Sequence, residues 1–337
     1  MPTVWLEMQK LDVPASGLGE VCAGLAAALE RQAPAGVTLH RYRPRRRVRD
    51  RWLGVAAPGC ALWHGLHQDT PYWPRRRSIP VLLTVHDLNF LLPGAPPARR
   101  RARLAALQRR VDRSAALAAV SEFTAGMIRE HLTLGARSLT VIPNGNPLDP
   151  AVVAERPAWA PPAPFLLALA HIHPKKNLAA LLPLLTHRAD LRLVLAGDTR
   201  HPYAAGIRRQ AESLAIAPRL LMPGVVEPPV QRWLLENCAA FTLPSLAEGF
   251  GLPVVEAMSL GKPLFLSDRC SLPEVGGPDA FYWRDFSPDA MAEILDQGLA
   301  ASAADAARAG RLRRRAAQFS WDNAARRYLV LYRQLAR

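Results

Sequence analysis

The chain contains the stretch Leu243-Pro-Ser-Leu-Ala-Glu248-Gly-Phe-Gly-Leu-Pro-Val-Val-Glu256-Ala-Met-Ser-Leu-Gly261, which decides its fold. This stretch sets Glu248 and Glu256 eight residues apart around a glycine-rich turn. The apolar run 239–243 predicts a buried strand that leads into the turn. Pro253 lies where a helix would begin and Gly261 just past its end, the positions that each residue favours. The turn therefore joins a strand to a helix.

The start of that helix is a predicted anion-binding site. The backbone N–H groups of Phe250, Gly251 and Leu252 would face outward, where four donors lack internal partners and the helix dipole favours negative charge. Glu256, on the predicted first turn, could accept ribose hydroxyls as acidic residues do in dinucleotide-binding folds, with Glu248 nearer a sugar. The alternative is a capped helix whose glutamates compensate the dipole, but the glycines favour a binding site.

Short apolar runs alternate with helical or loop segments along the whole chain. This alternation predicts parallel sheets, which bind ligands at the carboxyl ends of their strands. The first strand is expected at Thr3–Met8, followed by a glycine turn and a helix. Further strands are expected at 61–66, 79–85, 115–120 and 139–142, and then at 165–170, 191–196, 220–223, 239–243 and 263–266.

The domain organisation follows from length and proline content. The chain has 337 residues, more than a usual single domain, and its proline-rich segment 147–164 predicts a linker. We therefore expect an α/β fold of two Rossmann-like domains, 1–160 and 161–318, that face a cleft. The segment 319–337 predicts a C-terminal amphipathic helix with Ser320 as its cap.

Hydropathy and cysteine usage indicate the compartment. No window has the roughly 18 to 20 uninterrupted apolar residues of a membrane span, and the N-terminus lacks a basic region followed by an apolar one. We expect a cytoplasmic protein that could be peripheral on the inner face of the membrane. The cysteines lack metal-ligand spacing, so reduced thiols without zinc or disulfides are expected. They are Cys22, Cys60, Cys238 and Cys270.

The net charge of +15 is concentrated in the first half of the chain, where residues 1–160 hold 22 basic and 12 acidic residues. Arginine clusters at 41–49, 75–77 and 99–103 could draw the protein to an anionic membrane surface or a phosphorylated glycolipid. A solvated basic face is an equal alternative, and only four basic residues are lysines, which suggests a coding bias toward arginine. No nucleic acid is expected as a partner, because regular aromatic residues are missing from the basic stretches.

Short motifs accompany the paired glutamates in a fixed order along most of the chain. They are Ser16-Gly-Leu-Gly19, Thr84-Val-His86-Asp87, Ala119-Val-Ser121-Glu-Phe-Thr124, Val141-Ile-Pro-Asn144-Gly145, His173-Pro-Lys-Lys176-Asn177, Ala196-Gly197 and Ser271-Leu-Pro-Glu274-Val. Together they resemble the retaining glycosyltransferases of family 4, the glycosyl transferases group 1, with their E-x7-E signature. The resemblance implies a GT-B fold in which the C-terminal helix crosses back to the first domain.

The resemblance also assigns cations to the site. Lys176 matches the family's phosphate-binding lysine, and it is one of only four lysines in the chain. Where the family usually has an arginine, five residues earlier, this chain has His171. An imidazole can still bind a phosphate that raises its pKa. His173, Lys175 and Arg269 are possible substitutes.

The remaining site residues follow from the same resemblance and from the glycine pattern. His86 would contact the donor sugar and, with Lys176 and Glu248, act in catalysis, while Gly17 and Gly19 would let the donor approach backbone N–H groups. Asp87 is expected to be structural. The other predicted donor-binding residues are His171, Gly224, Val225, Phe250, Gly251, Leu252 and Glu256, of which Gly224 and Val225 would touch the nucleobase.

The sequence thus predicts a retaining glycosyltransferase that moves a sugar from a nucleoside-diphosphate donor to a hydroxyl of a glycolipid or oligosaccharide acceptor, in bacterial lipopolysaccharide or surface polysaccharide synthesis. No Asp-x-Asp motif occurs, so fixed cations and helix dipoles, without a metal or cofactor, are expected to neutralise the diphosphate. A catalytically idle scaffold that partners another transferase and a nucleotide-sugar epimerase are the alternatives. A glycosidase is disfavoured because the glutamates flank an anion-binding helix start.

Overall fold

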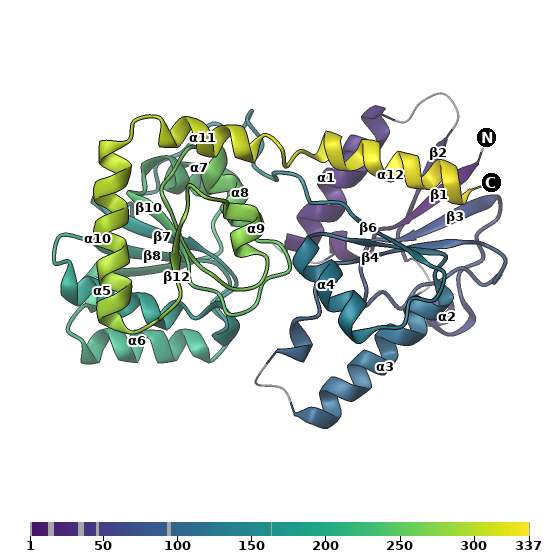
Figure 1. The fold of residues 1–337 in the computed structure, drawn as a ribbon, viewed down its shortest axis with the longest axis horizontal. Coiled ribbons are helices and arrows are strands. Elements are labelled where there is room, and N and C mark those ends of the chain that lie inside the picture. Colours follow the sequence, from purple (N-terminus) through teal and green to yellow (C-terminus); the bar gives the residue numbers. More distant parts are fainter. Residues whose placement is uncertain are drawn as a thin grey trace. The chain divides into compact units, whose positions relative to one another are not determined.

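The computed structural model describes residues 2–12, 17–32, 37–44, 47–92, 96–162 and 164–336. They form two compact units (Figure 1). Unit 1 combines Met1–Pro147 with Phe319–Arg337, and unit 2 is Leu148–Gln318. Ser16, in the predicted glycine loop, lies outside the described residues.

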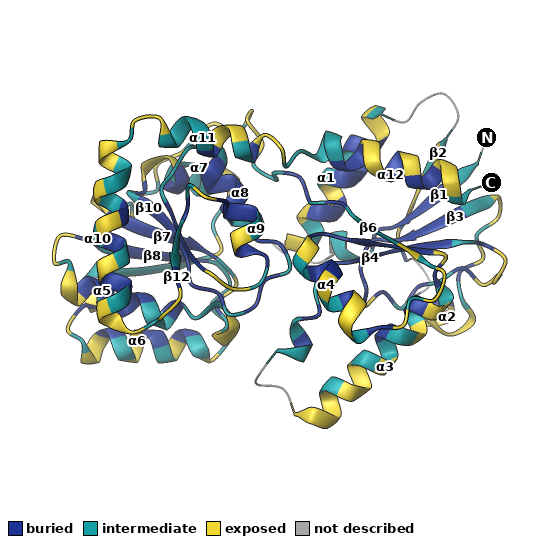
Figure 2. Ribbon diagram, in the orientation of Figure 1, coloured by how far each residue is buried: buried dark blue, intermediate teal, exposed yellow. Residues whose placement is uncertain are grey.

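Unit 1 is built on a parallel sheet of six strands in the order β2-β1-β3-β4-β5-β6. Residues of β4 and β5 enter two different hydrophobic clusters, so both faces of the sheet are covered, and all residues of these two central strands are buried (Figure 2). The strands are β1 (Thr3–Glu7), β2 (Thr38–Tyr42), β3 (Cys60–Gly65), β4 (Val81–Val85), β5 (Ala116–Ala119) and β6 (Ser138–Val141).

The five strands predicted for this half are confirmed within two residues. The sequence does not predict β2, because this edge strand is largely exposed and polar. The helical elements are η1 (Gln9–Asp12), α1 (Gly17–Gln32), α2 (Arg47–Leu53), η2 (Asn89–Leu91), α3 (Pro97–Arg113), α4 (Glu122–His131) and α12 (Trp321–Leu335).

The C-terminal helix α12 returns to unit 1, as predicted, and packs beside α1. Ser320 caps it, since its Oγ accepts a hydrogen bond from the Asn323 N–H at 3.1 Å. A buried polar chain fixes α12 to the sheet: His64 lies 2.6 Å from the Tyr332 hydroxyl and 2.8 Å from Thr84 Oγ1. Burial lowers the pKa of His64 to about 3, so the ring is neutral and offers one donor and one acceptor.

Unit 2 repeats the design with the strand order β12-β11-β10-β7-β8-β9, all parallel. The five predicted strands are confirmed within one residue, whereas the three-residue edge strand β12 is not predicted. The strands are β7 (Phe165–Leu169), β8 (Arg192–Ala196), β9 (Leu220–Gly224), β10 (Ala240–Leu243), β11 (Leu264–Ser267) and β12 (Phe281–Trp283).

Helices connect the strands of unit 2. They are η3 (Pro174–Lys176), η4 (Leu178–Leu181), α5 (Leu182–His187), α6 (Tyr203–Ser213), η5 (Ala217–Arg219), α7 (Pro228–Asn237), α8 (Leu252–Ser259), α9 (Leu272–Gly276), α10 (Pro288–Ala304) and α11 (Arg308–Ala316). α8 is the helix that the sequence predicts between Pro253 and Gly261.

The predicted boundary at residue 160 lies later than the division in the structure, which follows Pro147. The segment after Pro147 joins unit 2 because its backbone binds to α7. Arg232 Nη1 donates to the Asp149 carbonyl at 3.2 Å, and the Glu155 N–H donates to the Pro229 carbonyl at 3.0 Å. The prolines of this segment exclude regular structure but leave its other backbone groups able to bond.

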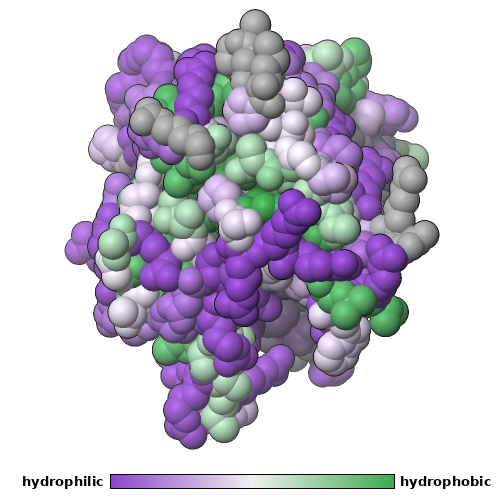
Figure 3. Space-filling view, turned by 90° about the vertical axis from the view of Figure 1, so that its right-hand side faces the viewer, coloured by the Kyte–Doolittle hydropathy of each residue, from purple (hydrophilic) through white to green (hydrophobic). Residues whose placement is uncertain are grey.

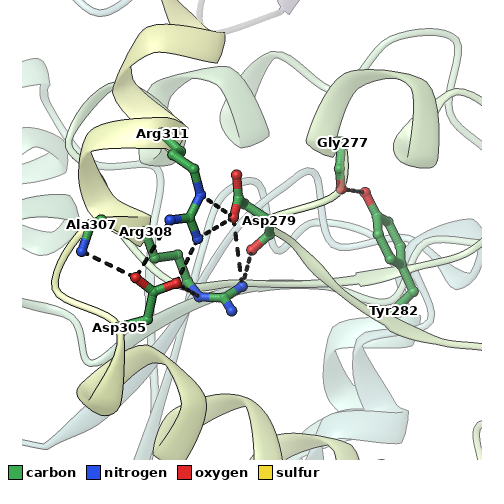
Figure 4. A network of polar contacts seen from close by, with 7 residues as sticks. All are labelled: Gly277, Asp279, Tyr282, Asp305, Ala307, Arg308 and Arg311. Carbon is green, nitrogen blue, oxygen red and sulfur yellow. Dashed lines mark hydrogen bonds and ion pairs between the residues drawn. The ribbon is translucent and has the colours of Figure 1, made fainter.

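Two arginines fasten α11 to the rest of unit 2 (Figure 4). Arg311 lies 2.7 Å from Asp279 Oδ1 and 2.6 Å from Asp305 Oδ2, and Arg308 Nη1 donates to the Asp279 carbonyl at 2.9 Å. A Cβ atom at Gly261 would lie 3.0 Å from that of Ala309. α11 therefore lies directly against the end of α8, the helix of the paired glutamates.

None of the helices in the described ranges combines the length and the apolar character that crossing a bilayer requires.

The close packing of α12 against residues 144–146 gives a stability prediction. A Cβ atom at Gly145 would lie 2.3 Å from the backbone nitrogen of Trp321, so Gly145→Ala should force α12 outward and cost about 1–3 kcal/mol. Gly126→Ala is the matched control, because a Cβ there meets open space within α4 and alanine should stabilise the helix by about 0.5–1 kcal/mol. Denaturant midpoints of the two variants would measure the difference. Equal midpoints would refute this account of α12 docking.

Candidate functional site

The glycine-rich turn between β10 and α8 has a conformation that only glycine adopts easily. Gly251 precedes α8 with φ +101°, and a Cβ there would lie 3.0 Å from Leu272 Cδ2. Pro253 follows in the first helical turn. Gly251 is the N-cap residue of α8, and it has no side chain that could accept a hydrogen bond from the first N–H groups of the helix. Phe250, Gly251 and Leu252 lie at this helix start, as predicted.

An ion pair at this turn joins two of the predicted catalytic residues. Lys176 Nζ lies 2.5 Å from Glu248 Oε1, and both side chains are largely buried, with 15% and 11% exposed. Ser245 Oγ donates to the same oxygen at 2.8 Å. Both contacts fall on Oε1, so among the described residues Oε2 is the oxygen of this carboxylate that remains for a ligand hydroxyl.

Local structure explains how Lys176 reaches the turn. Pro174 begins the short helix η3, His173 Nδ1 accepts from the Lys175 N–H at 3.2 Å, and Asn177 ends it with φ +53°. Asparagine tolerates this left-handed conformation better than most residues. The Lys175 carbonyl accepts from the Leu246 N–H at 2.8 Å, which ties the lysine loop to the glutamate loop.

Buried serines hold the glutamate loop from the other side. Ser271 Oγ lies 3.3 Å from the Glu248 carbonyl and 3.1 Å from the Phe250 carbonyl, and Ser267 Oγ donates to the Ser245 carbonyl at 2.5 Å. The three serines are fully buried. These contacts could not be predicted from the sequence, since a serine in a loop is common, although Ser271 lies in the motif Ser271-Leu-Pro-Glu274-Val.

Glu256 differs in position from the sequence prediction. It is the fifth residue of α8, and the first turn of this helix has no acidic residue. Its side chain is 3% exposed, and Oε2 accepts from Gln231 Nε2 of α7 at 2.9 Å. The helix begins at Leu252, and the exact start of a helix is poorly fixed by sequence alone. Gln231 is a further site residue that the sequence analysis does not identify.

His171 lies half-exposed at the end of β7, in place of the family's arginine. Its Nδ1 is 3.7 Å from Asp198 Oδ2, but Arg200 binds that same carboxylate oxygen at 2.5 Å. Burial lowers the pKa of His171, as do Lys175 and Lys176, while Asp198 raises it. The net direction is downward from the ordinary value of 6.5, so the free imidazole is neutral at pH 7.

Two more imidazoles lie beside His171. The rings of His171 and His173 are 6.2 Å apart, and those of His173 and His201 are 4.6 Å apart. Burial and the neighbouring His201 lower the pKa of His173 as well. The ends of β7 and β8 thus carry a row of three imidazoles next to Lys175 and Lys176.

Gly224 and Val225 follow at the end of β9. The Gly224 carbonyl accepts from the Gly197 N–H at 2.8 Å, and Gly197 has no room for a side chain because a Cβ would lie 1.8 Å from the Ala170 carbonyl oxygen. A Cβ at Gly224, by contrast, meets open space. Val225 is 55% exposed. Gly224 and Val225 are therefore accessible for the predicted contact with the nucleobase.

The predicted site residues of unit 1 form a separate set. Gly17 and Gly19 are the first and third residues of α1, so they lie within the helix rather than in the predicted loop. His86 follows β4 but is only 6% exposed, and its Nε2 donates to the Leu66 carbonyl at 2.8 Å in the neutral ring. Burial lowers its pKa. Contact of His86 with a donor sugar stays a prediction.

A second buried histidine, which the sequence analysis does not identify, accompanies His86. The His67 ring lies 5.8 Å from that of His86, and burial lowers the pKa of His67 to about 2. Gln68 Oε1 accepts from the His86 N–H at 2.9 Å, and its amide donates to the Asp87 carbonyl at 3.1 Å. Asp87 thus has the structural role predicted for it, since its Oδ1 accepts from the Asn89 N–H at 2.9 Å.

Within the described ranges, no three His, Cys, Asp or Glu side chains come together as a metal site would need. The site in unit 2 instead gathers Lys176, Glu248, Glu256 and His171 around one edge of a parallel sheet.

Two parallel six-stranded units, a returning C-terminal helix and a lysine–glutamate pair at a helix start define a GT-B glycosyltransferase. Residues 54–149 match the family "Glycosyltransferase Family 4", and residues 154–316 match "Glycosyl transferases group 1". Both matches are to models of glycosyltransferase family 4, and the chain belongs to that family.

Similar proteins support the assignment. The serotype-specific mannosyltransferase WbdA of Escherichia coli is 31% identical over 233 residues, which are 64% of this chain and 28% of that protein. The chain therefore spans less than a third of this relative. Among solved structures, sucrose-phosphate synthase of Thermosynechococcus elongatus has a TM-score of 0.76 at 18% identity, with 99% of both chains covered. HepE of Anabaena, in complex with UDP and glucose, has a TM-score of 0.70 at 15% identity and covers 99% of this chain and 100% of its own.

The buried ion pair predicts a difference between adjacent lysines. Lys176→Met removes the cation beside the largely buried Glu248 and should lower the free energy of unfolding by about 1–3 kcal/mol. Lys175→Met is the matched control, since Lys175 is exposed and should cost little. Thermal and urea unfolding without ligand would compare them. Equal stability of the two variants would show that the pair contributes nothing to the ligand-free fold.

Proposed function

We propose that this chain is a retaining glycosyltransferase that moves a sugar from a nucleoside-diphosphate donor to a hydroxyl acceptor without a divalent metal. One observation carries the proposal: Lys176 and Glu248 are paired at 2.5 Å next to the open start of α8. A cation and a helix N-terminus suit a diphosphate, and a carboxylate with one oxygen remaining suits a sugar hydroxyl.

The departing diphosphate is the group that most needs stabilisation. As its bond to the sugar breaks, negative charge grows on the phosphate oxygens, and fixed donors aimed at that charge lower the barrier. Lys176 and the N–H groups at Gly251 and Leu252 supply such donors. His171 adds another when it is protonated, which the charge of a bound phosphate favours.

The glutamates hold the neutral parts of the donor. Glu248 Oε2 would accept a sugar hydroxyl while Oε1 stays with Lys176 and Ser245. Glu256, oriented by Gln231, would accept ribose hydroxyls, and the open surface at Gly224 and Val225 would receive the base.

In the reaction proposed, the acceptor oxygen attacks the anomeric carbon on the face that the diphosphate leaves. The carbon–oxygen bond to the phosphate breaks, a bond to the acceptor oxygen forms, and the acceptor proton passes to the departing phosphate. The configuration is retained, and no protein base is required. The contact of His86 with the sugar rests on the family resemblance.

The names of two relatives suggest the substrates. WbdA is named a serotype-specific mannosyltransferase, and a second Escherichia coli relative is named an O-antigen chain mannosyltransferase. We therefore propose a mannose donor and a surface-polysaccharide or lipopolysaccharide acceptor, at a cytoplasmic site. HepE was solved with UDP, but at 15% identity this likeness concerns the fold.

Donor binding and turnover test the proposal. Among GDP-mannose, UDP-glucose and UDP-N-acetylglucosamine, GDP-mannose should raise the melting temperature most, because a bound ligand stabilises by mass action. Lys176→Ala and Glu256→Gln should weaken donor binding or transfer roughly ten- to a hundredfold, as expected for lost hydrogen bonds to charged groups. Glu212→Gln, an exposed change in α6, is the control.

Transfer should persist in saturating chelator, since Lys176 and the helix start neutralise the diphosphate. Loss of transfer in chelator, with recovery on adding magnesium or manganese, would refute metal independence but not glycosyl transfer. A protein that neither binds nor transfers any donor tested would support the idle scaffold instead.

The imidazole at position 171 predicts a pH-dependent affinity. The pKa of His171 is lowered in the free protein, and a bound diphosphate should raise it, so donor binding takes up a proton. Affinity should therefore increase as the pH falls from about 8 toward 6. His171→Arg, which is always charged, should bind at least as well and with a flatter profile.

Calorimetry from pH 6 to 8 would measure these affinities. His187→Arg is the control, because His187 pairs with Asp296 rather than with the lysine loop, and it should keep the wild-type profile. A pH-independent wild type together with a weaker His171→Arg variant would show that His171 does not serve the diphosphate.

A further inference from the structure

The short helix α2 exposes large apolar side chains to solvent. Val48, Trp52 and Leu53 are 74%, 80% and 60% exposed. Val48 and Trp52 are four residues apart and share one face of the helix. Figure 3 looks onto this side of unit 1 and shows, at the height of α2, a hydrophobic group beside hydrophilic side chains. No other helix of the described residues has three exposed large apolar side chains.

The opposite face of α2 is fixed to the protein core. Asp50 is buried, and its Oδ2 accepts from the Tyr42 hydroxyl at 2.8 Å. Tyr42 belongs to a buried cluster with Trp5 and Trp63. Because this polar bond occupies the inward face, the helix cannot turn its apolar residues toward the core. They are available to a partner.

Arginines surround this apolar patch. Arg49 and Arg51 are exposed on α2, and the following turn 75–77 adds three exposed arginines. That turn lies against the helix end, since Arg75 Nε donates to the Leu53 carbonyl at 3.2 Å. In residues 47–53 and 74–78 the one carboxylate is the buried Asp50.

The basic surface continues toward α3. Arg113, at the end of α3, donates from Nη2 to the Arg76 carbonyl at 3.2 Å. The exposed arginines of α3 are Arg99, Arg101, Arg103 and Arg109, of which Arg103 pairs with Asp69 at 3.4 Å. The apolar side chains of α2 are thus bordered by a basic surface that extends to α3.

We propose that the α2 patch, Val48, Trp52 and Leu53 with Arg49, Arg51 and the turn 75–77, docks unit 1 on an anionic lipid bilayer. Tryptophan favours the boundary between headgroups and acyl chains, where its ring is apolar and its N–H stays hydrated. Arginine stems lie along apolar surface while their guanidinium groups reach lipid phosphates. The combination matches a bilayer surface in both chemistry and charge.

The same residues suit a nucleic acid less well. Single strands are bound by successive aromatic side chains along a basic groove, whereas α2 offers one tryptophan between aliphatic residues. Val48 and Leu53 gain nothing from phosphates, but they gain from leaving water for acyl chains. The inference concerns a surface of unit 1 and does not depend on the transfer reaction proposed for unit 2.

Vesicle binding tests the proposal. The intact protein should sediment with vesicles of phosphatidylcholine and phosphatidylglycerol and bind pure phosphatidylcholine at least tenfold more weakly. Arg51→Gln with Arg76→Gln should weaken binding roughly twentyfold, from about fivefold per arginine at low salt. Arg208→Gln with Arg209→Gln, two exposed arginines of α6, is the matched control and should bind like the wild type.

Trp52→Gln should weaken binding to the anionic vesicles about tenfold or more, and this loss should persist in high salt, because burial of an apolar side chain is not screened. Trp159→Gln, a change at an exposed tryptophan of unit 2, should bind normally. Unchanged melting temperatures would show that the variants fold. Wild-type vesicle binding by Trp52→Gln would overturn the proposal, as would tighter binding to duplex DNA that depends equally on Trp52.

Discussion

The ion pair between Lys176 and Glu248 is the interaction on which the arrangement of unit 2 depends. Two charges that are largely buried must satisfy each other, so the loop after β7 and the loop after β10 cannot move apart without exposing both. Ser245, Ser267 and Ser271 then tie the glutamate loop to its neighbours. A charged site is thereby held in place before any ligand is bound.

Parallel sheets explain why the chemistry gathers where it does. All strands of a parallel sheet end at the same edge, so residues far apart in sequence come together there. In unit 2 this edge receives Lys176, Glu248 and His171, and in unit 1 it receives His67 and His86. An apolar cluster covers one face of each sheet. In unit 1 the neutral His64 also links the sheet to α12.

Arginine has two different uses in this chain. Several arginines end helices by donating to their last carbonyl groups: Arg137 binds the end of α3, Arg219 that of α5 and Arg315 that of α9. These residues have structural partners, so the net charge of +15 overstates the free positive surface. The arginines around α2 and those of α3 that are exposed would face an anionic surface, even where one of them, Arg75, also donates to the end of a helix.

Most of the fold and part of the site could be predicted from the sequence, because both depend on local patterns. Alternating apolar runs gave ten strands within two residues, and glycine and proline fixed the turn before α8. Lys176 and Glu248 could be named because they sit in motifs with few other uses. The edge strands β2 and β12 could not be predicted, since one is polar and the other has three residues.

Only the tertiary structure decided the rest, because it depends on contacts between distant residues. Gln231 orients Glu256 from another helix, and His86 turns to the Leu66 carbonyl. The segment after Pro147 joins unit 2 through bonds to α7 that no local pattern records. Trp52, an apolar residue that composition would place in the core, stays outside because Asp50 already occupies the inward face of its helix.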